Sequence, residues 1–376
     1  MAGLQAKQSL ALPFAPRPCP DEIMSSWLSR VACRYDCEPE PLFTLLLSSK
    51  QEAEWSDGAA IDWGMSLPHQ LCIAEATHLH STVVASCDAA QRFPLVPVFW
   101  FSWPNCLAVA GDGEPRASQF AWAWCPDCLT ESHKQTGQDF LRMEWCFAPV
   151  TLCARHQRPL LNHCLCGSRE RPVHVASGKE SRLCCSQCGL LLAGQGRRRS
   201  RQEPLRTFAA ASVQLSFEQD LMAALSGQPV GVRWCGAAKP AELLAAVSDI
   251  ADVLCAASGH RGDVPLDAFD TCSHYRPRLH LPNVHHKLCG LSADWRRQVI
   301  AAVLAVIGDA NVCAVMASDQ RLEERPILEE FRQWSGSLEW LIHFIRPAYR
   351  HGLYRRATHW PPRLRARYRA GVTGLY

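Results

Sequence analysis

The 376-residue sequence predicts a mainly α-helical chain with a small cysteine-rich module near its centre, in which short β-hairpins are expected. Three observations predict this. Several segments place apolar side chains three or four residues apart, which is the spacing of one helix face. Seven cysteines and one histidine form close pairs between positions 125 and 188. The chain is also about twice as long as an ordinary domain, so we expect two or three domains.

The first helix is expected within residues 19–35. Its apolar residues recur every four positions, at Ile23, Trp27 and Val31. Because residues four apart share one face of a helix, these three side chains should point into a core. Asp21 and Glu22 stand where acidic residues favour a first helical turn.

Two more N-terminal helices are expected at residues 38–49 and 66–80, the latter with Ser66 as its N-cap. Three short helices joined by tight turns fit a helix-turn-helix unit, and they fit any small helical bundle equally well. The pattern of apolar residues does not choose between these two arrangements.

Helical patterns return in the C-terminal half, at residues 240–259, 292–309 and 327–356, with Ser292 as a cap of the second. Residues 92–120 are rich in proline and aromatic side chains, which predicts irregular structure. We therefore expect three domains, listed here with their bounds: an N-terminal helical, helix-turn-helix-like domain over 1–115, a cysteine-rich module over 116–195 and a C-terminal helical domain over 196–376.

The close pairs of cysteine and histidine make up two sets of four. The first set is Cys125, Cys128, Cys153 and His156, and the second is Cys164, Cys166, Cys185 and Cys188. Four thiolate or imidazole ligands are what a tetrahedral structural zinc ion requires. The sequence therefore predicts tandem zinc ribbons that hold two structural zinc ions. Two alternatives stay open in the second set, because His163 could replace Cys164 and Cys184 could replace Cys185.

Other kinds of cysteine chemistry fit less well. The N-terminus has only a short apolar run and the chain has no stretch of 18 apolar residues, which favours a cytoplasmic protein without a membrane span. Structural disulfides are rare in a reducing cytosol. A redox C-x-x-C motif needs a thioredoxin-like context. The sequence has no H-E-x-x-H motif, zinc-deaminase signature, phosphate-binding loop or nucleophile elbow, so we expect no enzyme activity.

Basic residues gather in two places. The segment from 341 to 376 holds eight arginines and no acidic residue, and a second basic run occupies 196–201. Such segments can bind nucleic-acid phosphates, although a solvated surface has the same composition. The candidate contacts are Arg197, Arg198, Arg199, Arg355, Arg356, Arg363, Arg365, Arg367 and Arg369. Pro361 and Pro362 should separate the last six into two short surfaces.

Three stretches of this sequence carry a resemblance to a known family. The segment PRPCPDEIMSSWLSRVACRY at 16–35 resembles the P-x-P-x-E-x-x-x-S-W-L-x-R-x-A motif that opens the TniQ family of transposition proteins. The first C-x-x-C pair, the Trp segment after it and the C-x-x-H pair resemble that family's zinc block. THWPPRLRARY at 358–368 resembles a W-P element near the end of some members.

The resemblance implies a non-catalytic adaptor for target selection in transposons similar to the Tn-seven group. Such adaptors engage target DNA directly, or engage an RNA-guided CRISPR effector of the Cascade type with its guide RNA, and they recruit an AAA+ ATPase. Whether this chain forms a homodimer is left open by the sequence. Two rivals remain: a stand-alone zinc-ribbon transcription regulator, and a nuclease or transposase component that uses carboxylates such as Asp249 and Asp252.

Overall fold

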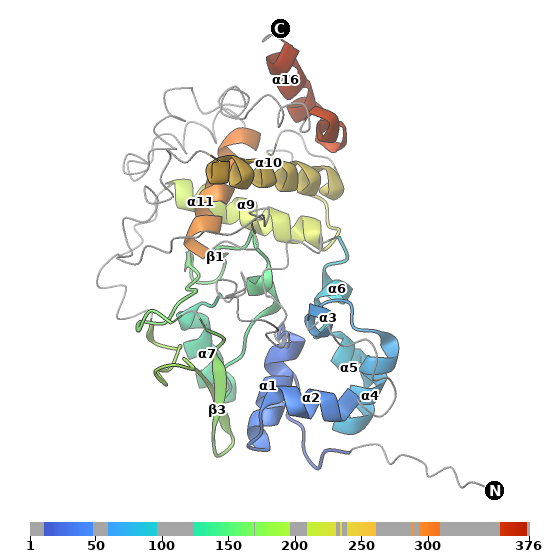
Figure 1. The fold of residues 1–376 in the computed structure, drawn as a ribbon, viewed down its shortest axis with the longest axis vertical. Coiled ribbons are helices and arrows are strands. Elements are labelled where there is room, and N and C mark those ends of the chain that lie inside the picture. Colours follow the sequence, from blue (N-terminus) through green and yellow to red (C-terminus); the bar gives the residue numbers. More distant parts are fainter. Residues whose placement is uncertain are drawn as a thin grey trace, which may run out of the picture. The chain divides into compact units, whose positions relative to one another are not determined.

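The computed structural model contains two compact units (Figure 1). The first consists of residues 1–96, 101–147 and 160–203, and the second of residues 97–100, 148–159 and 204–376. Within them the structure describes residues 11–47, 59–95, 123–168, 170–195, 209–230, 234, 239–260, 288, 293–308 and 354–373. The described part is mostly helical with two small antiparallel β-hairpins, so the predicted fold class is confirmed at this level.

The first unit begins with three helices at the places that the sequence predicts, and with three shorter ones. The expected helices are α1 (Met24–Arg34), α2 (Pro39–Leu47) and α4 (Leu67–Thr77). The shorter ones are α3 (Ala59–Asp62), α5 (Ser81–Ala85) and α6 (Ala89–Arg92). A helix-turn-helix function for these elements stays a prediction.

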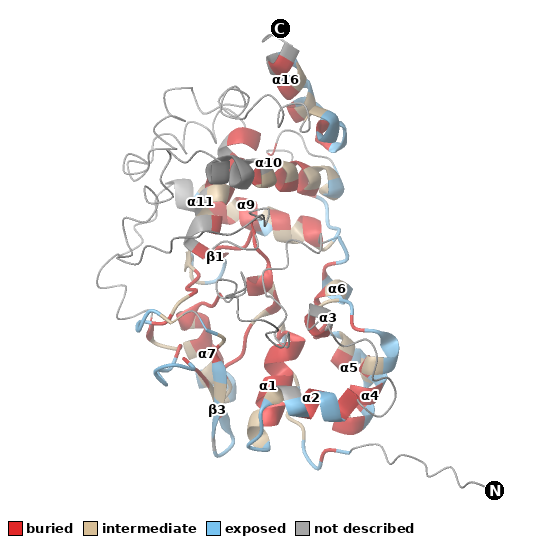
Figure 2. Ribbon diagram, viewed as in Figure 1, coloured by how far each residue is buried: buried red, intermediate tan, exposed pale blue. Residues whose placement is uncertain are grey.

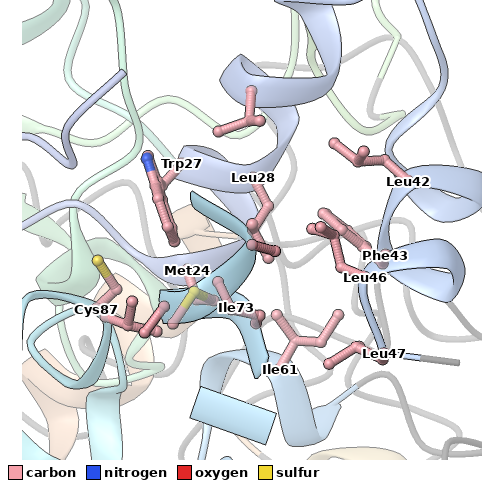
Figure 3. Packing of buried hydrophobic residues seen from close by; sticks show 14 of the residues in the cluster. Met24, Trp27, Leu28, Leu42, Phe43, Leu46, Leu47, Ile61, Ile73 and Cys87 are labelled. Atoms are coloured by element: carbon pink, nitrogen blue, oxygen red, sulfur yellow. The ribbon is translucent and has the colours of Figure 1, made fainter. Parts of the chain in front are cut away.

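The core of this unit surrounds α1, which is buried along most of its length (Figure 2). Ile23, Trp27 and Val31 are all 0% exposed, so the predicted core face is confirmed. Figure 3 shows Phe43 of α2 and Ile73 of α4 in the same apolar cluster as Trp27. Burial of each such large side chain stabilises the fold by about 1.5–3 kcal/mol.

The predicted start of the first helix is wrong by a few residues. Helix α1 begins at Met24, so Asp21 and Glu22 lie before it and its first turn holds no acidic residue. Two backbone hydrogen bonds hold this stretch outside the helix, because the amide of Ile23 donates to the carbonyl of Leu141 and the amide of Met143 donates to the carbonyl of Asp21. Residues 22 and 142 thereby form a β-bridge. Tertiary pairing therefore overrides the local helix signal.

The carboxylate of Glu22 points into the core and meets Arg30. The Nε of Arg30 donates to Glu22 Oε1 at 2.8 Å, and its Nη2 donates to Glu22 Oε2 at 2.5 Å. Ser26 donates its hydroxyl to the same carboxylate at 3.0 Å. The indole Nε1 of Trp27 donates to the carbonyl of Pro16 at 2.7 Å. Polar residues of the opening motif thus hold the N-terminal segment against α1.

Ser66 occupies the N-cap position of α4, but its side chain makes no capping hydrogen bond. Its hydroxyl instead lies 2.8 Å from Nδ1 of His69. The prediction of Ser66 as the N-cap residue is therefore confirmed in position, but the expected hydrogen bond from its side chain to the helix is absent. Pro68 follows near the start of this helix, where a missing amide hydrogen is tolerated.

The cysteine-rich residues of the first unit comprise helix α7 (Pro126–Thr136), the 3-10 helix η3 (Met143–Cys146) and the hairpin of β3 (Val173–Ser177) and β4 (Glu180–Cys184). The end of α1 covers the outer edge of β3. Cys33 donates its thiol to the carbonyl of His174 at 3.3 Å. The guanidinium of Arg34 donates to the carbonyls of Gly178 and Lys179 in the turn of the hairpin. These contacts fasten the end of α1 to the β3–β4 hairpin.

The second unit contains helices α9 (Ala209–Leu225), α10 (Pro240–His260) and α11 (Ala293–Ile307), which pack on one another. It also contains the short hairpin of β1 (Leu152–Cys153) and β2 (Arg158–Pro159), the 3-10 helix η7 (Ala357–His359) and α16 (Pro362–Thr373). Helices α10 and α11 match the predicted segments to within a few residues.

Some predicted features lie outside the described residues. These are most of the irregular segment 92–120, the cap Ser292, the helical segment 327–353 and both predicted domain boundaries, so the three-domain division stays a prediction. In the part of the chain that the structure describes, no helix combines the length and apolar character needed to cross a bilayer.

Candidate metal centres

The first candidate metal centre consists of the first predicted set, Cys125, Cys128, Cys153 and His156, whose ligand atoms all lie within 4.8 Å of one another. Cys125 is the N-cap residue of α7, and Cys128 lies in its first turn, so the start of this helix sets their spacing. Cys153 ends β1, and His156 lies in the turn that leads to β2. A helix start and a hairpin turn thus supply two ligands each.

The second candidate centre consists of Cys164, Cys166, Cys185 and Cys188, whose sulfur atoms also lie within 4.8 Å of one another. Cys164 and Cys166 come from the loop before β3, and Cys185 and Cys188 follow directly after β4. The antiparallel pairing of β3 with β4 therefore brings the ligand pair before the hairpin next to the ligand pair after it.

The separations between ligand atoms fit a tetrahedral zinc ion. Zinc–sulfur bonds of about 2.3 Å and zinc–nitrogen bonds of about 2.0–2.1 Å place S and N about 3.6 Å apart, and two S atoms about 3.8 Å apart. The Sγ of Cys153 lies 3.6 Å from Nδ1 of His156. The Sγ atoms are 3.6 Å apart in the pair Cys164–Cys188 and 3.7 Å apart in the pair Cys166–Cys185. Both sets could therefore hold a metal ion, and their donors and spacing are consistent with zinc.

Residues with a positive φ follow three of the four ligand pairs. These are Gln157 (49°) after His156, and Gly167 (89°) and Gly189 (69°) after Cys166 and Cys188. The left-handed conformation turns the chain sharply at each ligand pair. Glycine adopts it without a steric penalty, whereas glutamine at position 157 must be held there by its surroundings.

Hydrogen bonds from neighbouring groups reach the sulfur atoms in both centres. The backbone amide of His156 donates to Cys153 Sγ at 3.4 Å, and Gln195 Nε2 donates to Cys164 Sγ at 3.2 Å. Burial works against ionisation of Cys185, but the backbone amides of Cys188 and Gln187 donate to its sulfur, and the pKa of this thiol is lowered to about 7. Such donors stabilise thiolates, which are the metal-binding form of cysteine.

The structure also bears on the two alternative ligands of the second set. Nδ1 of His163 lies 3.0 Å from Oδ1 of its neighbour Asn162, and His163 is not part of the ligand group. Cys184 is buried beside the group without belonging to it, and burial raises the pKa of its thiol. The group that the structure brings together thus contains Cys164 and Cys185, and their assignment as ligands stays a prediction.

Sequence reasoning missed Glu218 of α9, which supports the hairpin of the first centre. Its Oε2 accepts hydrogen bonds from the backbone amides of Thr151 and Leu152, both at 2.8 Å. Its Oε1 accepts from the Thr151 hydroxyl at 2.5 Å and from Gln214 Nε2 at 3.0 Å. Burial raises the pKa of this carboxyl to about 7, although the four hydrogen bonds oppose the shift. No spacing rule links Glu218 to β1, so the sequence offered no signal for it.

The predicted nucleic-acid contacts fall into three groups. Arg197, Arg198 and Arg199 lie outside the described residues. Three others contact protein groups, namely Arg356 with Asp249 at 3.1 Å, Arg365 with the Thr358 carbonyl at 2.8 Å and Arg369 over the Tyr354 ring at 5.5 Å. Arg355, Arg363 and Arg367 are exposed and form no ion pair with another described residue.

The chain path at the basic end follows the prediction. The 3-10 helix η7 ends at His359, and α16 begins at Pro362, so the prolines separate the two basic stretches. Trp360, between them, is 1% exposed and donates its indole Nε1–H to Asp249 Oδ2 at 2.8 Å. Asp252 lies 4.0 Å from Arg356. The two carboxylates named for a nuclease, both in α10, thus have structural partners in Arg356 and Trp360.

Residues 13–160 match the TniQ family, which confirms the resemblance stated from the opening motif and the first metal set. The match includes the whole first candidate centre and ends before the second one. No curated protein matches the chain.

Proposed function

We propose that this chain is a non-catalytic adaptor that selects the target site for DNA transposition. The observation that carries the proposal is the TniQ match over residues 13–160, which implies a part in transposition target selection. In this role the chain engages target DNA, or an RNA-guided effector bound to it, and recruits an AAA+ ATPase that directs the transposase.

The chemistry of the metal centres supports a role without catalysis. A catalytic zinc ion keeps one coordination position for water or substrate. Each candidate centre here offers four protein ligands, which is the number that closes a tetrahedral site. The matched opening motif points the same way, because Glu22, Trp27 and Arg30 are buried and hold the fold rather than a substrate.

A stand-alone transcription regulator with zinc ribbons is the second candidate, since it would need the same closed centres and exposed arginines such as Arg363 and Arg367. The two functions differ in their partners. An adaptor binds a transposition ATPase, whereas a regulator binds specific DNA and needs no such ATPase.

The test has two arms. The tagged full chain is co-purified with the AAA+ ATPase of its transposon, and transposition is measured in cells with and without this chain. The proposal predicts a stable complex and a loss of targeted insertion when the chain is absent. Unchanged insertion frequency and target choice, together with sequence-specific DNA binding by the chain alone, would favour the regulator.

A further inference from the structure

The two candidate metal centres differ in how far their ligands are exposed. In the first centre Cys125, Cys128 and Cys153 are 0%, 1% and 1% exposed, and His156 is half-buried. In the second centre the buried cysteines Cys164 and Cys185 are 2% and 5% exposed, whereas Cys166 and Cys188 are exposed. Two of the four thiolates of the second centre therefore face solvent.

The solvent side of the second centre is held by exposed contacts. Glu170 accepts hydrogen bonds from Ser186 Oγ at 3.0 Å and from Gln187 Nε2 at 2.5 Å, and all three residues lie at the surface. Leu165 and Leu190, which flank the exposed cysteines, are 37% and 39% exposed themselves. Solvent-exposed polar contacts contribute little to stability, so this side can open locally at low free-energy cost.

We propose that the second metal centre is an oxidation-sensitive site that releases its zinc ion when a peroxide reacts with it, while the first centre keeps its ion. The inference rests on zinc in both centres and not on the role in transposition. Susceptibility of cysteine to oxidation follows thiolate character and solvent access, and Cys166 and Cys188 combine both when they bind a metal ion.

The chemistry balances with hydrogen peroxide as the oxidant. The exposed thiolate attacks one peroxide oxygen, the O–O bond breaks, and hydroxide leaves, so a sulfenic acid forms on the cysteine. A second thiolate of the same centre then attacks that sulfur and displaces hydroxide, which forms a disulfide. Two thiolates lose two electrons, the peroxide gains them, and two hydroxide ions are released, which the buffer neutralises. The zinc ion has then lost two of its four ligands.

Each exposed sulfur has a buried sulfur next to it as the resolving thiolate. The Sγ of Cys188 lies 3.6 Å from that of Cys164, and the Sγ of Cys166 lies 3.7 Å from that of Cys185. A disulfide bond is about 2.05 Å long, so closure needs a movement of less than about 2 Å. We expect the disulfide Cys164–Cys188 or Cys166–Cys185.

The test uses the zinc-loaded full chain and graded hydrogen peroxide, followed by native mass spectrometry and a chromogenic zinc chelator. The proposal predicts loss of one zinc ion per chain before any loss of the second. Peptide mapping at that stage should find a disulfide that joins an exposed to a buried cysteine of the second centre. Simultaneous release of both ions, first release from the first centre, or a disulfide elsewhere would overturn the proposal.

A pair of variants separates oxidation at the second centre from oxidation of other exposed thiols. Cys188→His keeps four zinc ligands and removes one exposed thiolate, so the first zinc release should become several-fold slower. Cys37→Ser removes an exposed thiol outside both centres and should leave that rate unchanged. If Cys188→His fails to fold, Cys166→His tests the same point. Because these measurements involve neither DNA nor the ATPase, their failure is distinguishable from a failure of the proposed function.

Discussion

Arg30 and Glu22 form a buried, doubly hydrogen-bonded ion pair, in which both side chains are 1% exposed or less. Removing one partner leaves an uncompensated charge in the core, which destabilises a protein by about 3–5 kcal/mol. We therefore expect Arg30→Met to lower the free energy of unfolding by that amount in chemical denaturation.

The exposed ion pair of Arg92 and Asp21 is the matched control, because these side chains are 48% and 40% exposed. Arg92→Ala should change the free energy of unfolding by less than about 1 kcal/mol, as exposed pairs do. Equal effects of the two substitutions would show that the buried pair is not what holds the N-terminal segment on α1.

Asp249 should matter for stability and not for DNA cleavage. Asp249→Ala leaves the buried indole N–H of Trp360 without its acceptor, which costs about 1–3 kcal/mol. Asp252→Ala, at a half-exposed residue 4.0 Å from Arg356, should stay within about 0.5 kcal/mol. Thermal unfolding of both variants measures this difference.

The same variants test the nuclease alternative. Purified chain should leave plasmid DNA intact with magnesium or manganese. Metal-dependent nicking that follows the chain through purification and disappears in Asp249→Ala would contradict an adaptor without catalysis.

Glu218 predicts a pH dependence of stability. Its pKa is raised from 4.5 to about 7 in the folded chain, so the folded state binds the proton more tightly than the unfolded state between these values. Stability then falls as pH rises through this window, by about 3 kcal/mol in total. Glu218→Gln removes the ionisation, so wild type should lose stability relative to this variant from pH 5 to pH 7.

Glu75→Gln makes the same substitution at an exposed position of α4 and is the control for this comparison. The measurement is the difference in free energy of unfolding between wild type and each variant. A difference for Glu218→Gln that does not change with pH would show that this carboxyl is ionised alike in both states.

The unpaired arginines of α16 are expected to carry nucleic-acid binding at the C-terminal end. Arg363 and Arg367 are exposed and four residues apart, so they share one face of the helix. If both contact duplex phosphates, the double substitution to alanine should flatten the slope of log affinity against log salt by about 2 units.

The fold of the double variant should remain intact, since exposed charges contribute little to stability. Lys239→Ala, at an exposed position before α10, should leave the slope unchanged. Unchanged affinity and slope in the double variant would assign these arginines to a solvated surface.

The sequence predicted the parts of this structure that local spacing determines. The four-residue repeat of Ile23, Trp27 and Val31 identifies a buried helix face because neighbours along the helix share that face. Short spacing within each ligand pair likewise identifies the cysteines of both centres. These signals operate over a few residues, so no knowledge of the tertiary fold was needed.

Contacts between distant segments could not be predicted in this way. Glu22 was assigned to the first turn of α1, but pairing with residues near 142 holds it outside the helix. Glu218 and Thr151, or Asp249 and Trp360, meet only because the chain folds back over many residues. A charge count along the sequence also missed that Arg356 has an acidic partner in α10.

The number of bound zinc ions tests the central claim most directly. Native mass spectrometry of the reduced full chain should find two zinc ions, because both sets have four ligands at tetrahedral spacing. Binding of structural zinc contributes about 10–16 kcal/mol to folding. Cys153→Ser should therefore give insoluble or protease-sensitive chain, whereas Cys72→Ser, at a buried cysteine outside both sets, should remain folded with two ions. One ion or none in the wild-type chain would contradict the account of two closed zinc centres.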